Sequence, residues 1–206
     1  EEKPNYTIGD LLEIMRILRS PEGCPWDREQ SHAAIKKNLI EEAYEAADAI
    51  VQNDAAALCE ELGDVLLQVV FHAQMAVEVG EFDFDAVCDG ICKKLIVRHP
   101  HVFGTVKADT AEKVLDNWAE IKKSEKGQAD TADVMNAVAR SLPALMRGQK
   151  IAKAAVKGGI LEPLQPCADP RSKINTLIWE AVRIAAAGKL DAEEVFSDYL
   201  NGFISQ

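Results

Sequence analysis

The chain has 206 residues, of which 48% are hydrophobic and 28% charged, a composition typical of a globular protein with a buried core. Its 34 acidic and 23 basic residues give a formal charge of −11, which argues against binding to a nucleic-acid backbone, because such binding needs a basic surface. No apolar stretch approaches the ~20 residues of a membrane span, so we expect neither nucleic acid nor membrane as a partner. Five cysteines without a Cys-x-x-Cys pair, and an N-terminus without a signal-peptide pattern, favour reduced thiols and a cytoplasmic location.

Apolar residues recur at helical spacing along the chain, and no period-2 run indicates a strand. Proline and glycine predict a loop over residues 20–27, and Asn53-Asp54 is typical of a turn followed by a helix N-cap. Gly80 and Pro100 are expected to end the helices that precede them. The predicted helices of this part of the chain cover residues 8–19, 31–51, 55–79, 84–99 and 109–127.

Beyond Gly127 the composition changes, and small polar residues at 128–132 predict a linker. Further helices are expected over residues 133–157, 172–187 and 192–202. The sequence thus predicts an all-α protein with two domains, residues 1–127 and 128–206.

Four acidic residues stand at mirrored distances from the turn at Asn53. Glu42 lies eleven residues before it and Asp64 eleven after, while Glu45 lies eight before and Glu61 eight after. In an antiparallel hairpin each of these pairs would lie at one height, roughly 12–17 Å from the turn at 1.5 Å per residue. Each helix presents its two acids on one face, because they are three residues apart. The spacing therefore predicts four carboxylates that face one another inside a helical bundle.

Such a cluster stays ionised only with compensating positive charge, since like charges raise one another's pKa. All-oxygen ligands select hard divalent cations, so we interpret the cluster as a Mg²⁺ site, with Mn²⁺ as the alternative metal. A second interpretation is that these are ordinary solvated glutamates on helix faces. A di-iron centre would require two Glu-x-x-His repeats, whereas only Glu29 and His32 fit that pattern.

Cations and one aromatic residue follow at helical spacing. Lys94 and Arg98 are one turn apart, as are Trp118 and Lys122, and Lys126 stands one turn further along. A pair of cations can hold phosphates, and a tryptophan beside a lysine can stack on a nucleobase above its phosphates. Each residue by itself is also compatible with surface charge or core packing. Together with the carboxylates they indicate a nucleotide site.

A run of motifs spans residues 9–127 in a fixed order. They are Cys24-Pro-Trp-Asp27, Gln30-Ser-His32, Glu41-Glu-Ala-Tyr-Glu45, Glu61-Leu-Gly-Asp64, Arg98-His-Pro-His-Val-Phe103 and Asn117-Trp-Ala-Glu-Ile-Lys122. This run resembles the MazG nucleoside triphosphate pyrophosphohydrolases. Ser31 departs from the threonine that is usual in that family.

The resemblance implies Mg²⁺-dependent hydrolysis of nucleoside triphosphates, ribose or deoxyribose, to the monophosphate and pyrophosphate. It implies that the metal ligands are Glu42, Glu45, Glu61 and Asp64, with Glu41 as a further acid that orients or deprotonates the attacking water. It also implies a homodimer or higher homo-oligomer whose subunits together complete a four-helix core. The nucleotide contacts that it implies are Lys36, Lys94, Arg98, Trp118, Lys122 and Lys126.

The segment from Ser141 to Lys150 resembles the linker into the second MazG domain of two-domain members. The acids that follow, Glu180, Glu193 and Glu194, lack the metal-binding spacing, so we expect a shortened second MazG-like helical domain without a metal site. Two alternatives remain for the function. One is a related pyrophosphohydrolase with a narrower substrate (dUTP, dCTP or phosphoribosyl-ATP), and the other is a non-catalytic helical interaction module.

Overall fold

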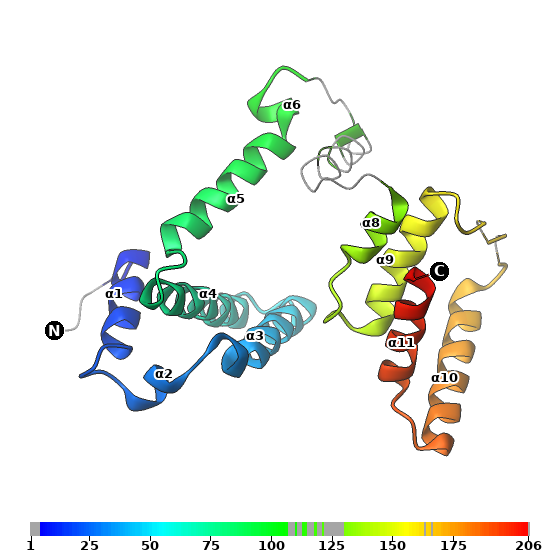
Figure 1. Ribbon diagram of the computed structural model, residues 1–206, viewed down its shortest axis with the longest axis horizontal. Coiled ribbons are helices and arrows are strands. Elements are labelled where there is room, and N and C mark those ends of the chain that lie inside the picture. The colour runs from blue at the N-terminus through cyan, green and yellow to red at the C-terminus, as the bar shows by residue number, and fades with distance from the viewer. Residues whose placement is uncertain are drawn as a thin grey trace. The chain divides into compact units, whose positions relative to one another are not determined.

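The structure is a computed structural model that describes residues 5–106, 110, 113–114, 118, 121, 130–162, 164–165 and 167–205. Every regular element among these residues is a helix, which confirms the all-α prediction (Figure 1). The chain divides into two compact units, Glu1–Val97 and Arg98–Gln206. The domain boundary predicted after residue 127 lies outside the described residues and stays a prediction.

The first unit is built on a long helical hairpin preceded by two shorter helices. Its elements are α1 (Ile8–Leu18), α2 (Pro25–Glu29), α3 (His32–Gln52), α4 (Ala55–Glu78) and α5 (Phe84–Arg98). The loop predicted over residues 20–27 is wrong at its end, because α2 begins at Pro25. A proline suits the first position of a helix, where its missing N–H would have no partner anyway.

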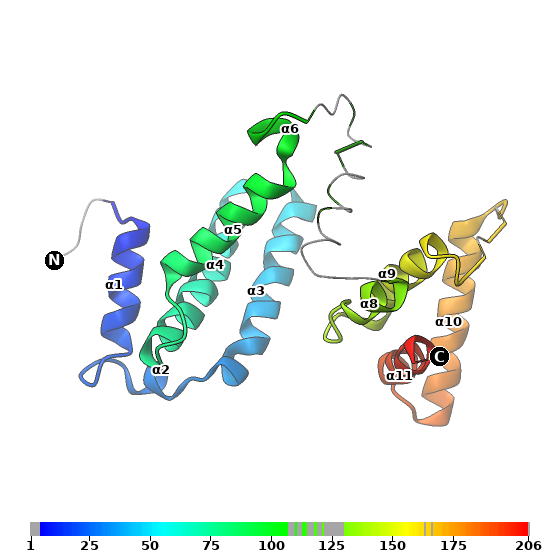
Figure 2. The same cartoon turned by 45° about the horizontal axis from the view of Figure 1, so that its top comes forward.

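The hairpin of α3 and α4 is defined by capping residues at both of its internal ends. The Ser31 hydroxyl accepts a hydrogen bond of 3.3 Å from the Ala34 amide at the start of α3. Asn53 ends α3 with φ at 55°, the left-handed conformation that asparagine tolerates well. Asp54 then caps α4 by accepting bonds of 3.0 Å from the amides of Ala56 and Ala57. The predicted turn and N-cap are confirmed, and α3 and α4 lie side by side in Figures 1 and 2.

The core of this unit lies at the end of the hairpin remote from Asn53. Five apolar side chains at most 5% exposed form it, with α1 packed against α4: Met15, Ile35, Val70, Phe71 and Met75. Arg19 follows α1 and pairs with Glu78 through two hydrogen bonds of 2.7 and 2.6 Å. The same guanidinium lies over the Phe71 ring and donates to the Asp27 carbonyl, so it ties α1 and α2 to the end of α4.

Helix α5 is different, because none of its residues is buried. Val87, Ile91 and Leu95 recur every fourth residue, and all three are exposed, so the described part of the structure leaves an apolar face of α5 largely accessible. Pro100 ends α5 as predicted, but it also begins a further turn, α6 (Pro100–Phe103). Most of the helix predicted over 109–127 lies outside the described residues.

The second unit contains α8 (Thr131–Asn136), α9 (Ala144–Lys157), α10 (Pro170–Gly188) and α11 (Ala192–Ile204). The single helix predicted over residues 133–157 is wrong, since the chain leaves helical geometry after Asn136 and resumes it only after Pro143. Proline disfavours helical backbone in the residue before it. A small core of Met135, Ile151, Ala155 and Leu200 joins α8, α9 and α11.

Two further features concern the chain as a whole. The five cysteines are free thiols. Of the helices that the structure describes, none combines the length and the apolar character required to cross a bilayer.

Candidate metal and nucleotide site

The predicted acids meet midway along the α3–α4 hairpin. One carboxylate oxygen from each of Glu42, Glu45 and Glu61 lies within 4.8 Å of the other two. Among the described residues this is the one group of three side chains that could hold a metal ion. Asp64 lies close enough that its charge acts on both Glu42 and Glu61. The mirrored positions in the sequence are thus brought together in space.

The electrostatics of this cluster are those of uncompensated negative charge. Partial burial raises the pKa of Glu42 above its ordinary value, and the charges of Asp64, Glu45 and Glu41 raise it further, as does hydrogen bonding to Glu45. The pKa of Glu61 is raised in the same way, by partial burial first and then by Glu45 and Asp64. Among the described residues, no cation counters these effects on either group. The cluster is therefore suited to a positive charge that comes from outside the chain.

The cluster forms here because of the periodicity of the two helices. Glu42 and Glu45 are separated by three residues on α3, and so are Glu61 and Asp64 on α4. The buried Ala46 and Ala49 on α3 allow the two backbones to approach closely near the turn. Glu41 is exposed beside the cluster and is the most weakly coupled of its acids to Glu42.

The predicted nucleotide contacts are distributed over several helices. The Arg98 guanidinium carbon lies 6.0 Å from the centroid of the Trp118 ring, so these two residues meet in a cation–π contact. Trp118 is 40% exposed and keeps an accessible face. Lys94 is exposed one turn before Arg98 on α5. Lys122 and Lys126 lie outside the described residues.

Lys36 lies on α3 and is exposed. It precedes Glu45 by nine residues, which at 100° per residue places it on the opposite side of the helix. The structure therefore does not bring Lys36 to the acids of its own hairpin.

Sequence reasoning did not single out the polar side chains that continue the acidic face of α4. Gln68 and His72 follow Asp64 at intervals of four residues and thus lie on the same stripe. Gln68 is only 6% exposed, and its Oε1 has no hydrogen-bond partner among the described residues. His72 faces His32 at the start of α3, with their Nδ1 atoms 2.7 Å apart. The signal that could have revealed them is the same periodicity, extended by two further turns.

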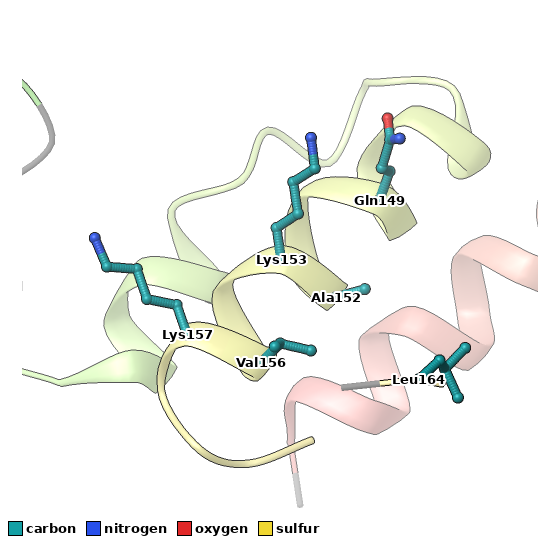
Figure 3. Close-up of a pocket in the computed structure, with 6 residues that line it drawn as sticks. All are labelled: Gln149, Ala152, Lys153, Val156, Lys157 and Leu164. Atoms are coloured by element: carbon teal, nitrogen blue, oxygen red, sulfur yellow. The ribbon is translucent and has the colours of Figure 1, made fainter. Parts of the chain in front are cut away.

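A separate hollow of about 490 Å³ lies along α9 in the second unit. Ala152 and Val156 point toward Leu164 across it, whereas the amines of Lys153 and Lys157 point away (Figure 3). None of its lining residues is acidic, so it offers no ligands for a hard cation. Its chemistry is that of an open apolar groove.

Comparisons with known proteins agree with the motifs. Residues 30–103 match the family model described as the MazG nucleotide pyrophosphohydrolase domain. The chain is 45% identical over 196 residues to the nucleoside triphosphate pyrophosphohydrolase of Escherichia coli (strain K12), covering 94% of this chain and 74% of that protein. It is 36% identical over 215 residues to the nucleoside triphosphate pyrophosphohydrolase/pyrophosphatase MazG of Thermotoga maritima, covering 96% and 82%. A solved structure of a mazG-related protein from Thermotoga maritima aligns with a TM-score of 0.48 at 32% identity, over 56% of this chain and 99% of that one.

Proposed function

The chain belongs to the MazG nucleotide pyrophosphohydrolase family, and we propose that it hydrolyses nucleoside triphosphates to the monophosphate and pyrophosphate with Mg²⁺ as its cofactor. The observation that carries the proposal is the group of three carboxylates within 4.8 Å of one another. Such a group, with Asp64 beside it and no compensating cation among the described residues, has no evident structural use. It does have the donor set of a site for a hard divalent ion.

The acids fit that ion in both number and kind. Four carboxylates from two helices, Glu42, Glu45, Glu61 and Asp64, provide oxygen ligands only, which favours Mg²⁺, with Mn²⁺ as the nearest substitute. The raised pKa values of Glu42 and Glu61 point the same way, because they reflect repulsion that a cation would relieve. A divalent ion bound there supplies charge neutralisation for the triphosphate and an activated water for in-line attack.

The remaining side chains have distinct roles in the proposal. Glu41 stands beside the ligands and is exposed, so it is suited to orient or accept a proton from the attacking water. Lys94 and Arg98 provide two positive charges for the polyphosphate. Trp118 offers an accessible ring face for the nucleobase, with Arg98 on one side of it. Lys36, Lys122 and Lys126 complete the proposed set of contacts.

A homodimer is part of the same proposal. Ile40 and Tyr44 on α3, like Leu62 and Leu66 on α4, adjoin the acids in sequence and are 38–57% exposed in the single chain. The apolar face of α5 is exposed as well. Helices of a second subunit would bury these surfaces and complete a four-helix core around the acids. Lys36, on the far side of α3 from its own acids, would then be available to a partner's site.

Residues 128–206 are proposed to form a shortened MazG-like domain that contributes packing rather than chemistry. Its described residues contain no group of three metal-binding side chains. Its acids Glu193 and Asp191 serve instead at helix ends, where Glu193 accepts from the Ala144 amide and Asp191 caps α11. These uses leave residues 128–206 with the character of an interaction module.

The decisive experiment measures pyrophosphate release from a panel of nucleotides, with Mg²⁺ and with a chelator. The panel contains the four ribonucleoside and four deoxyribonucleoside triphosphates, dUTP and phosphoribosyl-ATP. Mg²⁺-dependent release from most of the triphosphates supports the proposal. Release from dUTP, dCTP or phosphoribosyl-ATP alone would favour the narrower enzyme, and no release from any nucleotide would favour the interaction module.

A further inference from the structure

Two histidines tie the helices of the hairpin together at the end remote from its turn. His32 is the first residue of α3, and His72 lies five turns into α4. Their Nδ1 atoms are 2.7 Å apart, and the ring planes differ by 4°. The ring centroids are 5.0 Å apart. This separation is close to the 2.7 Å between the two Nδ1 atoms plus the distance from each ring centre to its own Nδ1, so both ring centres and both Nδ1 atoms lie nearly on one line. The rings therefore lie end to end in nearly one plane, and not face to face.

This arrangement is that of a straight N–H···N hydrogen bond. It holds one proton between two nitrogens, so one Nδ1 must donate and the other must accept. Burial lowers the pKa of His72 below its ordinary value, and the neighbouring His32 lowers it further, which favours a neutral imidazole at this position. A metal ion would not fit between the nitrogens, since two bonds of about 2.0 Å to one ion in this straight arrangement need a wider gap.

The unpartnered atoms nearby indicate the direction of the bond. The Nε2 atom of His72 and the Oε1 atom of Gln68 are both buried and have no hydrogen-bond partner among the described residues, and the two residues lie one turn apart on the same stripe of α4. Because Oε1 can only accept, the tautomer of His72 that suits this neighbour carries its proton on Nε2. In that tautomer Nδ1 of His72 is the acceptor and His32 is the donor.

The pair belongs to a seam that also holds the acids. Measured from Asn53, the acids lie eight and eleven residues away on both helices. Asn38 and Gln68 each lie fifteen residues away, while His32 and His72 lie twenty-one and nineteen away. The carboxylates thus stand between two ties, the capped turn at one end and the histidine pair at the other. Sliding of α3 along α4 would have to break one of them.

We propose that the His32–His72 hydrogen bond is a positioning device for the metal site: it fixes the register of α3 against α4 and so holds Glu42 and Glu45 opposite Glu61 and Asp64. Neither histidine is a ligand, and both act through the helices that carry the acids. This inference rests on the proposed metal site. A carboxylate group assembled from two helices keeps its geometry only while their register is kept.

An ion pair near the two histidines connects a different pair of helices. Arg19 and Glu78 form a two-bond ion pair that connects α1 to α4 and does not involve α3. This pair supplies a matched control, because its loss weakens the same core without freeing the register of the hairpin. Lys36 stands one turn after His32 on α3 and is exposed.

The test measures binding of Mn²⁺ alone to the full-length chain, by the electron spin resonance signal of the free ion, together with the melting temperature. His32→Ala and His72→Ala are expected to weaken Mn²⁺ binding about tenfold, the lower end of the range for residues that orient metal ligands. His72→Asn should recover most of that loss, because an asparagine amide can accept near the position of Nδ1. Glu78→Gln should lower the melting temperature without changing the affinity for Mn²⁺.

Each of these measurements has an outcome that would overturn the inference about the histidine pair. Wild-type affinity in His32→Ala overturns the inference, and so does a loss in Glu78→Gln as large as that in the histidine variants. If His72→Ala does not fold, the exposed His32 and the conservative His72→Asn still provide the comparison. Absence of Mn²⁺ binding in the wild type, or unchanged binding in Asp64→Asn, would instead refute the acid site itself and this inference with it.

Discussion

Replacing Glu42 by glutamine should have opposite effects on stability without and with a divalent ion. The pKa of the Glu42 carboxyl is raised by partial burial and by three neighbouring acids, Asp64, Glu45 and Glu41. Glutamine keeps the shape and the hydrogen-bonding capacity of the side chain but removes its charge. The metal-free variant should therefore be more stable than the wild type, whereas the metal-loaded wild type should be more stable than the variant.

The expected magnitudes follow from the geometry. Carboxylate oxygens of Glu42 and Glu45 lie within 4.8 Å, at which distance two unit charges in a water-like medium repel by about 0.9 kcal/mol. Because the site is partly solvated, screening reduces this, and we expect a gain of about 0.3–0.8 kcal/mol in the variant, or roughly 1–3 °C in melting temperature. Binding of an ion at a hundred times its dissociation constant stabilises the wild type by about 2.7 kcal/mol. Metal binding thus changes the stability more than the removal of the repulsion does. The variant should therefore be the more stable protein without metal, and the wild type the more stable one with metal.

Thermal unfolding followed by circular dichroism, in chelator and in saturating Mg²⁺, measures the stability of the wild type and of the variant without and with metal. Glu29→Gln is a matched control, because Glu29 is an exposed acid on α2 that is not among the charges acting on Glu42 or Glu61, and its replacement should change the stability appreciably in neither buffer. The reasoning is refuted if Glu42→Gln is less stable than the wild type in chelator. It is equally refuted if Mg²⁺ raises the melting temperature of the variant as much as that of the wild type. Pyrophosphate release by the variant should be abolished in either buffer.

Four further predictions concern nucleotide binding, subunit assembly, the pH dependence of stability, and the removal of residues 128–206. Trp118→Ala should weaken nucleotide binding by about 1–3 kcal/mol in calorimetry, the value of a lost base stack, and leave pyrophosphate binding unchanged. Ile91→Asp should convert a homodimer into monomers in light scattering, since it places a charge on the apolar face of α5. Because the folded-state pKa values of Glu42 and Glu61 are raised, metal-free stability in urea should fall as the pH rises through those values, and Mg²⁺ should offset the fall. A chain ending at Gly127 should retain Mg²⁺-dependent pyrophosphate release per folded molecule, and a soluble dimer that binds nucleotide without hydrolysing it would contradict this.

The hairpin and its acids could be predicted because every signal for them is local. Ser31 and Asp54 are N-cap residues whose side chains bond the amides next to them, and Asn53 tolerates the left-handed turn between the helices. Once the turn is located, the rise per residue fixes the height of each acid on either helix. The contact of Arg98 with Trp118 instead joins residues that are twenty positions apart in the sequence, and spacing alone could only indicate each as a separate candidate.

The incorrect helix boundaries lie at prolines, because a proline both disfavours helical backbone in the residue before it and suits the start of a helix. Pro25 and Pro143 each interrupt helical backbone before themselves, and each also precedes or opens a helix. Reading Pro25 as a loop residue missed α2, and overlooking Pro143 merged α8 with α9. The histidine pair was missed for another reason. His32 and His72 stand at unequal distances from Asn53, so equal spacing does not pair them, and only the reach of their side chains brings them together.

Apolar periodicity predicts a helix and a packing face, but it does not tell what covers that face. On α3 and α4 part of the periodic face is buried within the same unit, around Ile35 and Val70. On α10, Ile174 and Leu177 are more than half exposed, and Ala185 is the buried residue of that helix. Burying one such side chain contributes about 1.5–3 kcal/mol, so a face of several left uncovered is a large unused free energy. Since α5 carries the same kind of exposed face in the unit that holds the acids, burial against a second copy of the chain, as proposed above, would realise that free energy and enclose the proposed metal site.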